Sequence, residues 1–142
     1  MISNRRVSDG RDATYPARVI VKSHVPFRAV EAPPIAEFSV HPSPGRHGTV
    51  IGVRGELDIA TVPELARCIA KCEAPLVIVD MSQVTFIDSS GIRCLLGAYR
   101  VFEASSREFA IAGASGPVED ILRMTGLDVL LPMAPSVDSA AS

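Results

Sequence analysis

A continuous apolar segment followed by an amphipathic helical pattern constrains the fold of this chain most strongly. Residues 76–79 are Leu, Val, Ile and Val, without the polar interruption that would exclude a buried parallel strand. Downstream, apolar residues recur at helical spacing and make one stripe, formed by Ile92, Leu95, Leu96, Tyr99 and Phe102. The pattern predicts a central strand at 76–79 and a helix over about 90–103. We expect Leu95, Leu96 and, from a later strand, Ile111 to be buried against the sheet.

The same alternation of strands and helices continues on both sides of this unit. Two further helices are expected, one after the capping-box sequence that begins at Thr61 and one from Gly116 to Gly126. The other expected strands are 36–40, 49–57, 109–112 and 129–131. Strands that alternate with helices imply right-handed crossovers. The sequence therefore predicts a small α/β domain with a mixed, mainly parallel sheet, packed with helices and edged by an N-terminal β-hairpin.

Charge divides the 142 residues into a basic leader and an acidic domain. Residues 1–34 carry six basic and three acidic side chains, whereas the remainder carries eight basic against thirteen acidic ones, a net charge of −5. We expect a flexible N-terminal extension at 1–34, a folded domain at 35–134 and a flexible tail at 135–142. The chain lacks the basic stripe of a general nucleic-acid binder, and its acidic domain favours a partner with a basic docking face.

The cysteines and histidines form neither a catalytic nor a metal-binding pattern. Cys68 and Cys72 have the i,i+4 spacing of helical metal ligands, but every histidine lies at position 47 or earlier and supplies no evident third ligand. Cys94 makes the cysteine count odd, which favours reduced thiols in a cytosolic protein. Because no Gly-x-Ser-x-Gly motif or glycine-rich phosphate loop occurs, we expect no enzyme and no cofactor. Nor do we expect a signal peptide or a membrane span, which needs ~18 apolar residues.

Asp88, Ser89 and Ser90 lie at the N-terminus of the helix predicted over 90–103. Free backbone N–H groups and the positive end of the helix dipole are found there, so a phosphate on one of these hydroxyls would be tolerated locally. It would add roughly −1.5 to −2 charges to the surrounding surface. The simpler interpretation is a helix cap, which contributes about 1 kcal/mol without any regulation. The local sequence by itself favours the cap.

An ordered set of short motifs resembles the STAS family, the sulfate-transporter and anti-sigma-factor-antagonist domains, and above all its stand-alone bacterial anti-sigma factor antagonists. The resemblance covers about 35–131 and departs from the family at Ser105-Ser106-Arg107, which replaces a frequent Gly-Gly pair, and in the leader. The motifs that carry it are Gly55-Glu56-Leu57-Asp58, Val77–Ser82, Val84–Gly91, Leu95–Arg100, Pro117-Val118 with Leu122, and Thr125-Gly126-Leu127.

The resemblance implies a non-enzymatic switch protein of the cytoplasm. In this family the unmodified antagonist binds an anti-sigma factor that is also a serine kinase of the GHKL type, and this binding frees the sigma factor. The kinase phosphorylates the serine after the motif's Asp, here Ser89, and so breaks the complex, which a PP2C-type phosphatase restores. The oligomeric state is expected to be a monomer or a weak dimer. The implied partner-binding residues are Asp58, Asp88, Ser89, Ser90, Gly91 and Arg93.

Three alternatives remain open from the residues themselves. Asp58 could contact the partner near Ser89 or only shape the turn into the following helix. The domain could serve another assembly, such as a signalling complex or a lipid-transport ATPase, in which the serine pair is structural. It could also sense a small ligand in a pocket at the C-terminal edge of the sheet near Asp88.

Overall fold

Strands and helices alternate along the chain largely as the sequence predicts. The computed structural model describes residues 37–141. In chain order the elements are β1 (Ser39–Pro44), β2 (Thr49–Leu57), α1 (Val62–Lys71), β3 (Leu76–Ile87), α2 (Ser89–Ala104), β4 (Glu108–Ala112), α3 (Gly116–Met124), α4 (Leu127–Leu130), β5 (Met133–Ala134) and α5 (Val137–Ala141).

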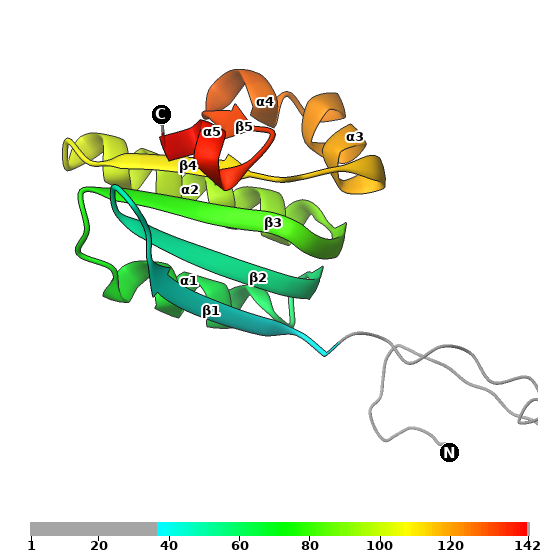
Figure 1. Ribbon diagram of the computed structural model, residues 1–142. Helices are drawn as coiled ribbons and strands as arrows, with labels where there is room; N and C mark the ends of the chain where they lie inside the picture. The colour runs from blue at the N-terminus through cyan, green and yellow to red at the C-terminus, as the bar shows by residue number, and fades with distance from the viewer. Residues whose placement is uncertain (1–36, 142) are drawn as a thin grey trace, which may run out of the picture. The chain divides into compact units, whose positions relative to one another are not determined.

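The sheet has the strand order β1-β2-β3-β4-β5, which confirms the predicted fold class. Strand β1 is antiparallel to β2, and the remaining neighbours are parallel. Because spatial order follows chain order, right-handed crossovers place the connecting helices on one face. Figure 1 shows α1 and α2 behind the sheet and α5 in front of it. Pro42 and Pro44 lie two residues apart in the edge strand, where their missing N–H groups disfavour pairing with another chain.

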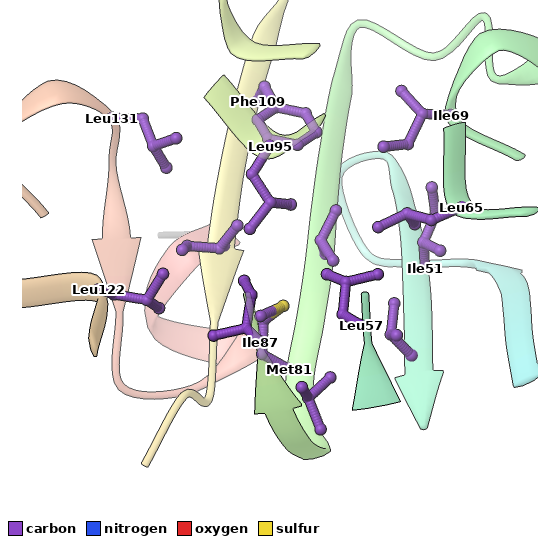
Figure 2. Packing of buried hydrophobic residues seen from close by; sticks show 14 of the residues in the cluster. Ile51, Leu57, Leu65, Ile69, Met81, Ile87, Leu95, Phe109, Leu122 and Leu131 are labelled. Atoms are coloured by element: carbon purple, nitrogen blue, oxygen red, sulfur yellow. The ribbon is translucent and has the colours of Figure 1, made fainter. Parts of the chain in front are cut away.

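The main core fills the layer between the sheet and its helices (Figure 2). Alternate residues of β2 and β4 point into it, including Ile51, Val53 and Ile111, each at most 1% exposed. Helix α2 contributes Leu95, which is fully buried, while Leu96 is only half-buried. The expected burial is confirmed for Leu95 and Ile111, but Leu96 lies at the flank of the apolar stripe rather than at its centre.

Strand β3 is longer than the predicted segment 76–79, because it continues to Ile87. Its pairing with β2 shifts register between Gly52 and Arg54 and again between Gly55 and Glu56. These bulges change the spacing of buried positions from two residues to three, and the buried side chains after Val79 are Met81, Val84 and Ile87. The continuous apolar run on which the prediction is based ends at Asp80, before the strand does.

The C-terminal region departs from the prediction in two ways. Residues 129–131 are not a strand: α4 occupies Leu127–Leu130, and Gly126 before it adopts a left-handed conformation with φ of 80°. The last strand, β5, pairs with β4 only after Pro132, which has no N–H to donate. The expected flexible tail at 135–142 contains α5, which contacts β3, β4 and β5.

The expected extension at 1–34 lies outside the described residues.

Arg107 connects three elements at the N-terminal edge of β4. Its guanidinium donates hydrogen bonds to the carbonyl oxygen of Cys72 at 2.7 Å and of Ala74 at 2.9 and 3.1 Å. It also lies 4.0 Å from the ring centroid of Phe102. The residue that replaces part of the family's Gly-Gly pair thus satisfies carbonyl groups at the end of α1 and joins them to α2.

Candidate functional site

Asp88 caps helix α2 through its side chain. One carboxylate oxygen, Oδ1, accepts hydrogen bonds from the backbone N–H of Ser90 at 2.8 Å and of Gly91 at 3.2 Å. Asp88 itself has an extended backbone, as an N-cap residue should, and Ser89 is the first helical residue. The cap is therefore supplied by the acid, and the two serine hydroxyls are not used for it.

A backbone hydrogen bond connects the start of α2 to the end of β2. The backbone N–H of Asp88 donates to the carbonyl oxygen of Leu57 at 3.2 Å, which aligns the ends of β2 and β3. Gly91 is buried against this junction. A Cβ at this position would lie 2.7 Å from Cγ1 of Ile87 and 3.0 Å from the Leu57 carbonyl oxygen, so only glycine allows the helix to approach so closely.

Asp58 organises the turn between β2 and α1. Its Oδ1 accepts from the backbone N–H groups of Ala60 at 3.0 Å and Thr61 at 3.2 Å. The Thr61 hydroxyl donates to the Glu56 carbonyl oxygen at 2.8 Å and makes no cap to α1, so the predicted capping box is wrong. Of the two roles open to Asp58, the structure displays turn formation. The same turn sets Asp58 beside the Leu57–Asp88 hydrogen bond.

The two serines differ in exposure. Ser89 is exposed and Ser90 is half-buried, and within residues 37–141 the Ser89 hydroxyl makes no hydrogen bond. Arg93, one turn further along α2, is also exposed. The fold thus brings the predicted partner-binding residues to one corner, at the ends of β2 and β3, with Ser89 and Arg93 as the accessible groups and Gly91 as packing.

Two apolar side chains at this corner were not predicted from the sequence as site residues. Ile59, next to Asp58 in the turn, is 75% exposed, and Phe86, near the end of β3, is 44% exposed. The signal for Ile59 was a large apolar side chain directly after Asp58 in the turn. Exposed apolar side chains beside polar ones are typical of the centre of a protein–protein interface.

A family model for the STAS domain matches residues 39–140. The chain belongs to the STAS domain family. Its curated relatives include the anti-sigma-B factor antagonist of Staphylococcus aureus, 29% identical over 84 residues, which are 57% of this chain and 78% of that protein.

Solved structures agree with the family and confirm the fold. The crystal structure of an anti-sigma factor antagonist from Mycobacterium paratuberculosis matches with a TM-score of 0.66 and 28% identity, over 73% of this chain and 91% of that one. The anti-sigma factor antagonist SpoIIAA in its unphosphorylated form matches with a TM-score of 0.57 and 25% identity, over 73% and 92% of the two chains.

The three cysteines of this STAS domain lie on or at the ends of helices, Cys68 and Cys72 at α1 and Cys94 in α2. Burial raises the pKa of the Cys68, Cys72 and Cys94 thiols, which keeps them protonated near neutral pH. The thiol of Cys72 donates to the Cys68 carbonyl oxygen at 3.3 Å. Among the described residues there is no cluster of three or more side chains suited to a metal ion, and no helix there is long and apolar enough to cross a bilayer.

A cavity of about 340 Å³ lies at the opposite end of the strands from Ser89. It is bounded by the β1–β2 turn, including Arg46 and His47, by Ile78 of β3 and by Val137 of α5. The ligand-sensing alternative placed a pocket near Asp88. This cavity contains none of the residues of that corner, so it does not support that alternative.

Proposed function

We propose that this STAS domain is a cytoplasmic, non-enzymatic anti-sigma factor antagonist. In its unmodified form it binds an anti-sigma factor that is also a GHKL-type serine kinase, and this binding frees the sigma factor. The kinase phosphorylates Ser89 and thereby ends the interaction, and a PP2C-type phosphatase reverses it. The partner-binding surface consists of Asp58, Asp88, Ser89, Ser90 and Arg93, and the buried Gly91 positions it.

The proposal rests on the different roles of Asp88 and Ser89 at the start of α2. Asp88 already caps α2, so the exposed, unbonded hydroxyl of Ser89 has no structural task within the described residues. A serine pair that served α2 as a cap would accept from these amides itself, and neither serine does so within residues 37–141. The names of the relatives, which are anti-sigma factor antagonists, support the same function.

The effect of a phosphate follows from the charges around Ser89. Asp88 lies next to it in the chain, and Asp58 lies in the adjoining turn. A dianion buried there in a complex built around a neutral hydroxyl must find a cation or pay a desolvation cost. A change of about 3 kcal/mol would lower the affinity about 150-fold, since 1.4 kcal/mol is tenfold.

The decisive experiment combines ATP, the cognate anti-sigma kinase and site mapping by mass spectrometry with a binding titration. We expect phosphate on Ser89, ATP-insensitive binding by Ser89→Ala, and weak binding by Ser89→Asp, with unchanged melting temperatures. Ser90→Ala is the matched control and should still be phosphorylated. Absence of phosphate together with full binding by Ser89→Asp would contradict the switch and favour a structural role in another assembly.

A further inference from the structure

Arg93 lies one helical turn after Ser89 on the exposed side of α2. Both side chains are exposed, and among residues 37–141 the Arg93 guanidinium makes no hydrogen bond, ion pair or ring contact. In a helix the Cα–Cβ bonds tilt toward the N-terminus, so a long side chain at i+4 leans back over residue i. The unengaged cation of Arg93 is therefore within reach of a group attached to Ser89.

Helix α3 displays the same arrangement with both partners present. Arg123 donates to the carboxylate of Glu119, four residues earlier, at 2.6 Å through one terminal nitrogen and at 3.2 Å through Nε. The anion precedes the cation in the chain, which is the favourable order for an i,i+4 pair. A phosphate oxygen on a serine is three bonds from Cβ, as is a carboxylate oxygen of glutamate. Phosphoserine at position 89 and Arg93 can thus form an i,i+4 ion pair of the same kind as the pair between Glu119 and Arg123.

The helix N-terminus leaves a phosphate on Ser89 in need of such a cation. Asp88 already binds the N–H groups of Ser90 and Gly91, which are two of the amides that would otherwise attract an anion. Its negative charge also repels the phosphate. The phosphate can use those amides only by displacing the cap.

We infer that Arg93 binds the phosphate of phosphorylated Ser89 within the same helix. This inference rests on the proposed function for the modification itself and adds a second consequence to it. Phosphorylation places an anion at the docking corner and at the same time occupies Arg93, which is otherwise free to meet an acidic group of the partner. The modified state then presents a closed Ser89–Arg93 pair to the anti-sigma factor.

The test uses the full chain with phosphoserine installed at position 89 during translation, so that no kinase is needed. Phosphorus NMR follows the second ionisation of the phosphate, whose surrounding charges are Asp88 on the same turn, Asp58 in the β2–α1 turn, and Arg93. Because Arg93 stabilises the dianion, Arg93→Gln should raise the midpoint by roughly 0.2–0.7 pH unit. Arg93→Lys should restore part of the shift. Arg100→Gln removes another exposed arginine of α2 and should change nothing.

An unchanged midpoint in Arg93→Gln would overturn the inference. The folding of each variant is checked by its melting temperature in the unmodified form, where no effect is expected because both arginines are exposed. The outcome is separable from the proposed function. A kinase that fails to label Ser89 contradicts the function and leaves the phosphate–arginine pair standing, whereas labelling of Ser89 with a null result here removes only Arg93 from the switch.

Discussion

Gly91 of α2 packs against Leu57 of β2 so closely that a single added methyl group would lie 3.0 Å from both the carbonyl oxygen and Cγ of Leu57. This contact sets the height of the helix N-terminus above the sheet. It therefore also sets the position of Ser89 and Asp88 relative to the turn that carries Asp58.

Gly91→Ala should destabilise the domain by about 1–3 kcal/mol, because the new methyl group overpacks the β2–α2 junction. Gly97→Ala is the matched control on the same helix. It meets no atom within 4 Å, so replacing a helical glycine there should stabilise by about 0.5–1 kcal/mol. Urea denaturation of both variants measures the difference, and equal effects would show that the junction can relax.

Asp88→Ala removes the acceptor for two amides at the start of α2 and should cost about 0.5–2 kcal/mol. Asp88→Asn keeps a good cap and should lose much less. Amide hydrogen exchange of Ser90 and Gly91 reports the same change locally. Unaltered exchange in Asp88→Ala would mean that another group satisfies these donors.

The difference between Leu95 and Leu96 can be measured directly. Leu95 is fully buried, so Leu95→Ala should cost about 2–5 kcal/mol of unfolding free energy. Leu96 is half-buried, and Leu96→Ala should cost about 1 kcal/mol. Chemical denaturation with equal m-values in both variants provides the comparison. If Leu96→Ala cost more unfolding free energy than Leu95→Ala, Leu96 rather than Leu95 would face the core.

Arg107→Ala should cost about 2–3 kcal/mol, because it leaves the Cys72 and Ala74 carbonyls without their charged donor and uncovers the Phe102 ring. Arg107→Lys keeps the charge but lacks the planar fork that reaches both carbonyls, so it should still lose about 1 kcal/mol. Thermal unfolding of the two variants separates the contribution of the charge from that of the planar guanidinium. If Arg107→Lys were as stable as the wild-type protein, the positive charge of Arg107 would account for its contribution and the planar guanidinium would not be needed.

Ser106→Gly should stabilise the domain by about 1 kcal/mol. Ser106 has φ of 59°, in the left-handed region, at the C-terminal end of α2, and the Arg107 N–H behind it donates to the Phe102 carbonyl oxygen at 2.8 Å. This is the position where helices usually place glycine, since a Cβ is strained there. Ser105→Gly, one residue earlier at φ of −97°, is the control and should not stabilise. A loss of stability in Ser106→Gly would show that the serine side chain contributes more than the strain costs.

The local sequence pattern was sufficient to predict the central strand of this protein and the helix that follows it. The apolar run at 76–79 and the helical stripe that follows involve residues only a few positions apart, so the strand, the helix and a cap among residues 88–90 follow from nearest neighbours in the chain. That Asp88 supplies this cap was seen only in the structure. The same holds for the order of strands and helices, from which the parallel sheet and its hairpin edge could be predicted. The resemblance to STAS domains pointed to the corner around Ser89 for the same reason, because its motif is contiguous.

Tertiary contacts decided the features that depend on residues far apart in the sequence. The carbonyls bound by Arg107 lie 33 and 35 positions away, so nothing near Arg107 indicates its role. Strand β3 continues to Ile87 because it pairs with β2 along its length, and the last strand, Met133–Ala134, is defined by its pairing with β4. Which of Leu95 and Leu96 is buried depends on how α2 is rotated against the sheet. The need for glycine at position 91 depends on how closely α2 approaches β2. That distance is a property of the packed domain, since it results from side chains of several elements meeting at once.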